Sequence, residues 1–106
     1  MSEPVKWKSK DKTELEFKPV LQTANWNEVG GLYLFANLNN SQWFIHYAGQ
    51  TNNFKNRIPN HDRWSEAKKL GATHVLAVVL ESQAKRDKYE EELIQELQPS
   101  LNTQLK

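Results

Sequence analysis

Two apolar stretches separated by a short polar segment form the clearest pattern in the chain. Residues 31–35 (Gly-Leu-Tyr-Leu-Phe) and residues 43–49 (Trp-Phe-Ile-His-Tyr-Ala-Gly) are rich in aromatic and aliphatic side chains, which favour extended strands. Residues 37–42 between them are rich in asparagine, with serine and glutamine, which is a composition typical of turns. The pattern therefore predicts two antiparallel strands joined in a hairpin.

Each of these strands carries a tyrosine two positions from a glycine. Side chains alternate along a strand, so each predicted strand has one face made of odd-numbered residues: Gly31, Tyr33 and Phe35 in the first, and Trp43, Ile45, Tyr47 and Gly49 in the second. A glycine within a strand often marks a bulge or the close approach of a ligand or backbone. The hairpin by itself leaves two roles open for the tyrosines, as core aromatics with a solvated hydroxyl or as part of a site.

The rest of the pattern predicts one more strand and several helices. A helical turn is expected after an N-cap at Thr51, Asn52 or Asn53, and it should end near Ile58 because Pro59 follows. A second helix is expected to start at residue 59 or 60 and to run to about residue 70, where a glycine follows. Residues 73–80 are apolar on both faces, which indicates a central strand. A last helix is expected over about residues 83–97, between a serine N-cap and a proline. The elements predict an α+β fold with a central sheet and flanking helices.

An acidic residue interrupts the apolar face of the last helix. At about 100° per residue, its apolar side chains share one arc, formed by Tyr89, Leu93, Ile94 and Leu97. Glu90 falls inside that arc, whereas its acidic neighbours project outward. Desolvating an unpaired carboxylate is costly, so Glu90 is expected to bind a cation, pair with a base or act as an acid. Arg86, one turn earlier in the arc, is the alternative explanation as a simple ion-pair partner.

His61 lies at the predicted start of the second helix. It falls outside the inward arc of that helix, which Trp64, Ala67 and Leu70 form, and it is therefore expected to be exposed. Such a histidine is either catalytic or incidental. The other two histidines are expected to have structural roles, and three scattered histidines without any cysteine give no zinc-binding pattern.

Composition restricts the class of protein further. The chain has 106 residues, which suits one domain with one modest core, and 25% of them are charged. No apolar run approaches the ~20 residues that cross a bilayer, and the start lacks a signal-peptide pattern. Disulfides and thiolate metal sites are excluded because there is no cysteine. We therefore expect a cytoplasmic protein that does not interact with membranes.

Residues 1–28 differ in character from residues 29–106. They contain a cluster of lysines interleaved with aromatic residues, a pattern that suits contact with a phosphate backbone. Either this segment is a solvated basic arm or it docks on the domain through its apolar residues. The candidate nucleic-acid-binding residues are Lys6, Lys8, Lys10 and Lys12, together with Lys55 of the main domain. The formal net charge of the whole chain is only +1, so these residues would need to be concentrated in space.

The hairpin resembles that of a known family. Gly31-Leu32-Tyr33 followed by Tyr47-Ala48-Gly49 is similar to the paired motif of the GIY-YIG nucleases, with leucine and alanine in place of the usual isoleucines. Both replacements are apolar for apolar, and neither removes a reactive group. The resemblance covers about residues 29–104.

Four further positions match the pattern of that family. Arg57 lies eight residues after the second glycine of the motif, as the family's arginine does. His61, four residues later, falls where some members carry a histidine and others a tyrosine. Glu90, four residues before Ile94, matches the metal-binding glutamate, and Asn102 matches a later asparagine. The helical arc selects the same glutamate independently.

The resemblance implies a fold, an activity and a cofactor. Members of the family have a small antiparallel sheet, with a three-stranded core, flanked by helices. They hydrolyse phosphodiester bonds in DNA and use one divalent metal ion. In this chain Glu90 would hold Mg²⁺, or Mn²⁺ in its place, and magnesium commonly binds one or two carboxylates and several waters.

The resemblance also implies a role for each remaining residue. Arg57 would clamp the phosphate, and Tyr33 would activate or position the attacking water. His61 titrates nearer neutrality than a phenol, so it would be the base or would relay a proton from Tyr33. Tyr47 would bind phosphate or orient water, and Asn102 would fix the geometry of the site. The division of work among the two tyrosines and the histidine stays open.

Two other functions compete with that of a nuclease. The chain could be a nucleic-acid-binding module of the same fold without cleavage activity, which the low net charge favours. It could also be a protein-interaction domain in which Glu90 and Arg57 form only a buried ion pair. A targeting protein or a second copy of the chain stays open as a further partner.

Overall fold

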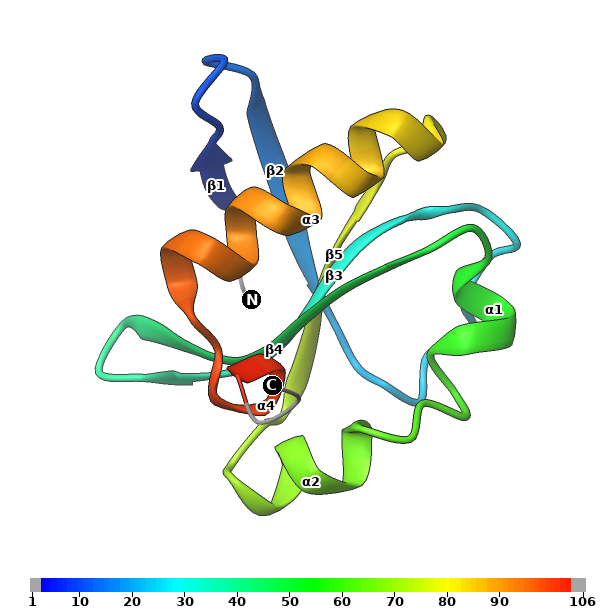
Figure 1. The fold of residues 1–106 in the computed structure, drawn as a ribbon. Coiled ribbons are helices and arrows are strands. Elements are labelled where there is room, and N and C mark those ends of the chain that lie inside the picture. The colour runs from blue at the N-terminus through cyan, green and yellow to red at the C-terminus, as the bar shows by residue number, and fades with distance from the viewer. Residues whose placement is uncertain (1–2, 104–106) are drawn as a thin grey trace.

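The protein has an α+β fold built on one antiparallel sheet, as the computed structural model of residues 3–103 shows (Figure 1). The five strands are β1 (Val5–Lys8), β2 (Glu14–Val20), β3 (Gly31–Asn39), β4 (Gln42–Thr51) and β5 (His74–Val79). The helices are α1 (Phe54–Arg57), α2 (Trp64–Lys69), α3 (Gln83–Leu97) and α4 (Ser100–Thr103). Within these described residues, no helix is both long and apolar enough to cross a membrane.

The sheet has five strands in the order β1-β2-β5-β3-β4, two more than the three-stranded core that the resemblance implies. The three strands predicted from the sequence, β5, β3 and β4, are contiguous in it, and β5 is central as expected. The N-terminal segment extends the sheet, because β2 pairs with β5 through Lys18–Val20 and β1 pairs with β2. The sequence indicates the β2 strand by its alternation of apolar and charged residues, since Leu15 and Phe17 are buried and Glu14 and Glu16 are exposed.

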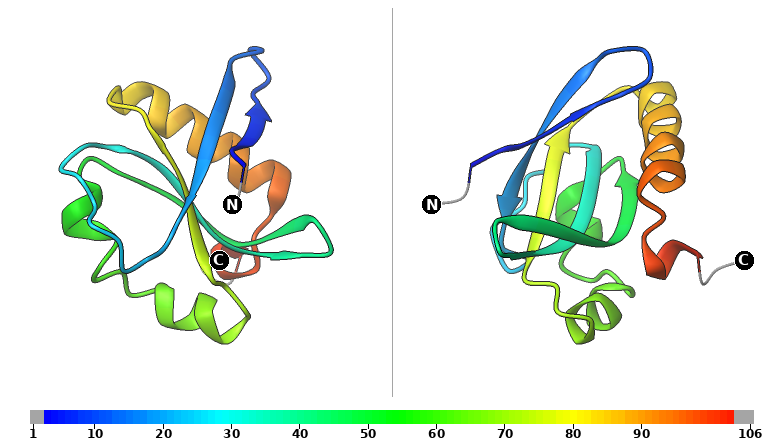
Figure 2. Two further views of the ribbon diagram at one scale, coloured as in Figure 1. Left: turned by 180° about the vertical axis from the view of Figure 1, so that it is seen from behind. Right: turned by 90° about the vertical axis from the view of Figure 1, so that its left-hand side faces the viewer.

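Two apolar clusters pack on opposite faces of the sheet. The helices that cover them are separate in the ribbon, with α3 lying apart from α1 and α2 (Figure 2). On one face α3 packs over a cluster that includes Leu32, Leu34, Phe17 and Leu76. On the other face α1 and α2 pack over Tyr33, Phe35, Val75 and their neighbours. Because successive residues of β3 point to opposite faces, its tyrosine belongs to the α1 and α2 face.

A β-bulge in the hairpin changes which residues of β4 share a face. Phe35 pairs with Tyr47, but Ala36 pairs with Ile45, so His46 is an extra residue in β4. Ile45 and Trp43 consequently pack on the α3 face, whereas Tyr47 packs with the cluster on the α1 and α2 face. The prediction that all the odd-numbered residues of this strand share one face was therefore wrong. The bulge brings Tyr47 to the same side of the sheet as Tyr33.

The two glycines of the hairpin make room for aromatic rings. Gly49 lies directly opposite Tyr33, and a Cβ at this glycine would come within 2.6 Å of the phenol ring and its oxygen. A Cβ at Gly31 would lie 2.0 Å from the carbonyl oxygen of Val78 in β5 and 2.7 Å from the ring of Phe54. Both glycines therefore permit close approach, as expected of glycines inside strands.

The helices partly follow the predicted boundaries. α3 spans the predicted residues, and the Ser82 hydroxyl accepts the backbone N–H of Lys85 as its N-cap. α2 begins at Trp64, four or five residues later than predicted, because residues 59–63 form turns in which the His61 N–H donates to the Ile58 carbonyl. Leu70 was expected to point inward, but it follows the end of α2 and is 49% exposed.

Candidate active site

His61 is buried among the aromatic side chains of the hairpin. It is only 6% exposed, and its ring meets those of Phe35, Tyr47 and Tyr33 edge-on, with centroids 4.8, 5.1 and 5.4 Å away. Its Nε2 atom lies 2.8 Å from the Tyr33 phenol oxygen. The prediction of an exposed helix-start histidine was wrong, because this residue lies in the turn before α2 and packs on β3 and β4.

The hydrogen bonds of His61 fix its tautomer. The backbone N–H of Arg63 donates to Nδ1 at 3.0 Å, so in the neutral ring Nδ1 is the acceptor and Nε2 carries the proton. His61 therefore donates to the phenol oxygen of Tyr33, and the Tyr33 hydroxyl proton points elsewhere. In this arrangement His61 orients the phenol and does not accept its proton.

Burial controls the protonation of this pair. It lowers the pKa of His61 to about 4, and the positive charge of Arg57 acts in the same direction. The expectation that His61 titrates near neutrality is therefore not met. Burial also raises the pKa of the Tyr33 phenol, as does neighbouring Tyr47, while Arg57 opposes the increase. At neutral pH both members of the pair are uncharged.

Arg57 is the last residue of α1 and faces the phenols. Its Nη2 donates to an Asp62 carboxylate oxygen at 3.2 Å, and 42% of its side chain is exposed. Its positive charge lowers the pKa of both tyrosines against the effect of their burial. The guanidinium is thus held by one exposed carboxylate and stays accessible to an anion beside the phenols.

Glu90 is half-buried in α3 and has no hydrogen bond or ion pair within residues 3–103. Burial raises the pKa of its carboxyl group, and the nearby charge of Asp87 adds to the increase. Glu90 is close enough to the two phenols for its negative charge to raise their pKa, although α3 covers the other face of the sheet. A partly desolvated carboxylate without a basic partner fits the binding of a cation.

Neither of the two ion pairs considered for Glu90 is formed. Arg86 is 3% exposed and donates to the Leu80 carbonyl and to the side-chain oxygens of Gln50 and Gln83. Arg57 pairs with Asp62 instead. The interpretations of Glu90 as half of a structural ion pair, with Arg86 or with Arg57, therefore do not apply to the described residues.

Asn102 joins α4 to the second half of the hairpin motif. Its side-chain oxygen accepts the backbone N–H of Ala48 at 2.8 Å, and its side-chain nitrogen donates to the carbonyl of the same residue at 2.9 Å. Both bonds fall between Tyr47 and Gly49, so Asn102 holds the backbone that positions Tyr47. Its contacts are with backbone groups rather than with the other candidate side chains.

Most of the candidate DNA-binding lysines lie away from Tyr33, Tyr47, Arg57 and His61, which together form the active-site cluster of the candidate site. β1, with Lys6 and Lys8, and β4 are the opposite edges of the sheet, and Lys10 and Lys12 lie in the turn after β1. Lys55 alone belongs to α1, two residues from Arg57, and it is exposed. The structure brings together Tyr33, Tyr47, Arg57 and His61, with Glu90 in electrostatic range, and leaves the N-terminal lysines apart from them.

Two acidic residues near the cluster were not anticipated. Asp62 pairs with Arg57, and nothing in the local pattern marks it. Asp87 lies three residues before Glu90, and this spacing places both on one helix face. The spacing could therefore have indicated from the sequence that Asp87 lies near Glu90. The Asp87 carboxylate accepts hydrogen bonds from Gln50 and Gln83. Among the described residues, no group of three or more carboxylate or histidine side chains could hold a metal ion, so Glu90 would bind one largely through waters and substrate.

Comparisons with protein-family models, with curated proteins and with solved structures find no match to this chain.

Proposed function

We propose that the protein is a metal-dependent endonuclease that hydrolyses phosphodiester bonds in DNA, of the GIY-YIG type. The observation that carries this proposal is Glu90: a half-buried carboxylate with no basic partner among residues 3–103, in electrostatic range of two phenols that Arg57 also faces. In phosphodiester hydrolysis a carboxylate can hold a metal ion, a guanidinium can bind the phosphate, and a phenol can position the attacking water.

Arg57 and Glu90 have different roles in the proposed reaction. Arg57 binds a non-bridging phosphate oxygen through its fork of donors, while Asp62 holds its other side. Glu90 would hold Mg²⁺ or Mn²⁺, which would stabilise the negative charge that develops on the phosphate oxygens. A cation at Glu90 would also neutralise this carboxylate. Its negative charge is one of the charges that raise the pKa of both phenols.

We assign to Tyr33 the removal of a proton from the attacking water, a step that requires the phenol to have first lost its own proton to solvent. His61 donates its Nε2 proton to the phenol oxygen at 2.8 Å, which aligns Tyr33 and stabilises the phenolate form. His61 is therefore a positioning residue, and its ring cannot act as the base while Nδ1 accepts the Arg63 N–H. Tyr47, which stacks on Phe35 with centroids 5.5 Å apart, orients water or phosphate at the same place.

A nucleic-acid-binding module without cleavage activity is the second candidate. Burial keeps Tyr33 protonated at neutral pH, which opposes its use as a base unless a cation binds nearby. The small net charge of +1 limits any binding that depends on phosphate neutralisation alone.

A cleavage assay with matched variants separates the two candidates. The purified protein is incubated with supercoiled, branched or single-stranded DNA and Mg²⁺ or Mn²⁺, in parallel with Glu90→Gln and Arg57→Ala. Glu91→Gln is the control for charge, because Glu91 is exposed on the same helix. We expect cleavage by the wild type and by Glu91→Gln, and a loss of roughly a hundredfold or more in the folded site variants.

The remaining outcomes contradict the nuclease proposal. Binding of DNA without cleavage in either metal would support the binding module. Cleavage that survives in Glu90→Gln would show that this carboxylate is not the metal ligand. Neither binding nor cleavage would leave a protein-interaction domain.

A further inference from the structure

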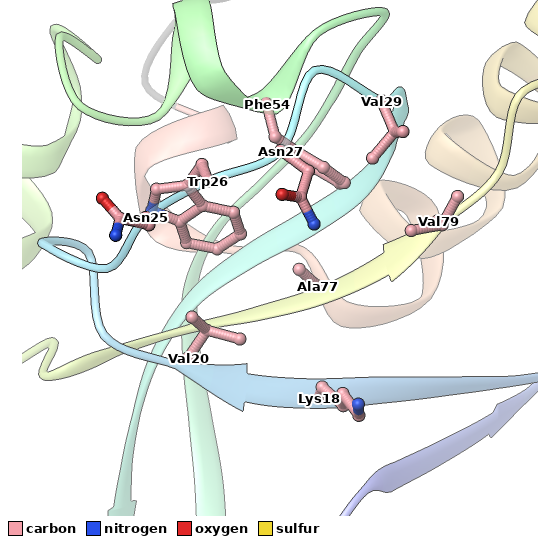
Figure 3. Close-up of a pocket in the computed structure, with 9 residues that line it drawn as sticks. All are labelled: Lys18, Val20, Asn25, Trp26, Asn27, Val29, Phe54, Ala77 and Val79. Carbon is pink, nitrogen blue, oxygen red and sulfur yellow. The ribbon is translucent and has the colours of Figure 1, made fainter.

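A second candidate binding site lies beside the active-site cluster on the same face of the sheet. It is a cavity of about 250 Å³ between the sheet and the loop that leads into β3 (Figure 3). Val20 of β2 and Ala77 and Val79 of β5 line the sheet side. Trp26 and Asn27 lie across the cavity from these strands (Figure 3), and Phe54 of α1, whose ring packs edge-on against that of Tyr33, also lines it.

The side chain of Phe54 lines the cavity and also contacts the active-site cluster. Its ring lies 5.5 Å from that of Trp26 and 6.5 Å from that of Tyr33, between centroids. It occupies the space that Gly31 leaves open, since a Cβ at this glycine would come within 2.7 Å of the ring. Gly31 therefore allows the Phe54 ring to take the position in which it both packs against Tyr33 and lines the cavity.

The loop that carries Trp26 is anchored to the helix that carries Arg57. The backbone N–H of Phe54 donates to the Val29 carbonyl at 2.9 Å, and that of Lys55 donates to the Asn27 carbonyl at 3.2 Å. α1 is a single turn, about 5.4 Å long, with Phe54 at its start and Arg57 at its end. A ligand in the cavity would consequently lie close to an anion held by Arg57.

The lining suits a planar ring that carries hydrogen-bonding groups and a negative charge. The half-buried indole of Trp26 offers an aromatic face, and the exposed carboxamides of Asn25 and Asn27 offer donors and acceptors. Among the residues that the structure describes, Lys18 is the one charged residue that lines the cavity, and no acidic residue does. A nucleotide combines these properties: its base stacks on aromatic rings, its edges pair with amides, and its phosphate attracts lysine.

We infer that this cavity holds the base of a nucleotide flanking the cleaved phosphate, stacked on Trp26, with the neighbouring phosphate at Lys18. The placement next to Arg57 rests on the proposed nuclease function, whereas the choice of a nucleotide as ligand rests on the lining. The site would then hold a strand whose base is turned out of its helix or is already unpaired, because a base stacked between its neighbours in a duplex cannot also stack on Trp26.

Binding to modified single-stranded DNA tests this inference without any cleavage. Fluorescein-labelled oligonucleotides, intact or with one abasic nucleotide at successive positions, are titrated by fluorescence anisotropy with EDTA present. An abasic nucleotide removes the base and keeps the phosphate. At one position it should weaken wild-type binding by about 5-fold to 150-fold, the range for one stacked base. Trp26→Ala should weaken binding of intact DNA similarly, and the two losses should not add.

Lys18→Glu tests the phosphate contact separately, with a matched charge control. Lys18 is exposed on β2, so its substitution should leave the fold intact, and binding should weaken about 10-fold or more at low salt. Lys85→Glu makes the same charge change at the exposed start of α3, outside the cavity, and should leave the affinity nearly unchanged.

The outcomes distinguish a failure of this inference from a failure of the nuclease proposal. If no abasic position matters and Lys18→Glu behaves like Lys85→Glu, the cavity does not hold a nucleotide, even if the protein cleaves DNA. If the base-dependent loss occurs in a protein that never cleaves DNA, the nucleotide site stands and the nuclease proposal fails. Additive losses for Trp26→Ala and the abasic strand would place the stacked base elsewhere.

Discussion

His61 illustrates how the surroundings of a residue determine its chemistry. Its ring touches three other rings, its Nδ1 accepts a backbone N–H, and its Nε2 faces the phenol of Tyr33. Packing excludes water and disfavours the imidazolium ion, while the hydrogen bond at Nδ1 selects one neutral tautomer. A residue type known for titrating near neutrality is thereby converted into a fixed hydrogen-bond donor.

The pH dependence of stability should reveal this conversion. The folded-state pKa of His61, about 4, lies below the ordinary value of 6.5, so the unfolded chain binds a proton that the folded chain does not in this window. Stability from this residue is therefore present above pH 6.5 and is lost as the pH falls towards 4, by up to about 3 kcal/mol. Urea unfolding of wild type and His61→Asn between these values measures it, and an equal slope in both proteins would contradict the assignment.

Gly49 makes a second prediction at the residue scale. The Gly49→Ala substitution should cost about 1–3 kcal/mol of unfolding free energy, because its methyl group would press on the ring of Tyr33. The displaced phenol should also lower cleavage activity. Chemical denaturation measures the first effect, and the substitution should cost much less in a Tyr33→Ala background, where the ring is gone. Equal costs in the two backgrounds would show that the ring is not what the glycine accommodates.

At the scale of elements, the β1–β2 hairpin supports the helix that carries Glu90. Asp11, in the turn of this hairpin, accepts hydrogen bonds from the Lys88 ammonium at 2.8 Å and the Tyr89 hydroxyl at 2.7 Å. Trp7 packs edge-on against Tyr89, with centroids 6.1 Å apart. Residues 88 and 89 directly precede Glu90, so the N-terminal strands hold α3 at the level of the candidate metal ligand.

Asp11→Asn should therefore loosen α3 and reduce activity. Hydrogen bonds from the Lys88 ammonium and, to a smaller extent, from the Ser9 hydroxyl hold the pKa of Asp11 well below its ordinary range. The Asp11 carboxylate therefore stabilises the folded protein at pH values above that ordinary range, and this stabilisation is lost in strong acid. We expect a lower melting temperature, faster hydrogen exchange in α3 and weaker metal binding. Glu14→Gln, at an exposed position of β2, is the matched control. Unchanged exchange in α3 would show that the hairpin does not support this helix.

At the scale of the whole molecule, the candidate site draws on most of the chain. β3 and β4 supply the phenols, α1 and the following turn supply Arg57 and His61, and α3 supplies Glu90. Each segment is positioned by contacts made elsewhere, such as those of Asn102 with β4. Only the complete fold therefore places the carboxylate in electrostatic range of the phenols.

The proposed binding of a metal ion by Glu90 should stabilise the whole molecule. Because burial raises the pKa of Glu90, its charged form is disfavoured in the folded protein, and Glu90→Gln should raise the melting temperature at neutral pH without metal. Adding Mg²⁺ or Mn²⁺ should stabilise the wild type, by about 2.7 kcal/mol at a hundred times the dissociation constant, but not the variant. Calorimetry measures both effects, and equal stabilisation of the two proteins would place the metal elsewhere.

Local patterns were sufficient for much of the fold. The alternation and turn residues predicted the β3–β4 hairpin, the two-sided apolar run predicted β5, and the serine N-cap and following proline marked α3. These predictions held because each depends on residues close together in the chain. The bulge at His46 and the late start of α2 were missed, because strand pairing and packing against β3 decide them.

The sequence by itself determined which reactive groups the chain possesses and, through helical periodicity, that Glu90 lies on an inward-facing arc. Tertiary structure alone decided that Glu90 has no basic partner among residues 3–103 and that His61 is buried as a neutral donor to Tyr33. It also decided that Trp26 and Lys18 line one cavity beside Arg57's helix. The reason is physical: desolvation and hydrogen-bond partners depend on segments far apart in sequence, and these set the charge and proton affinity of each group.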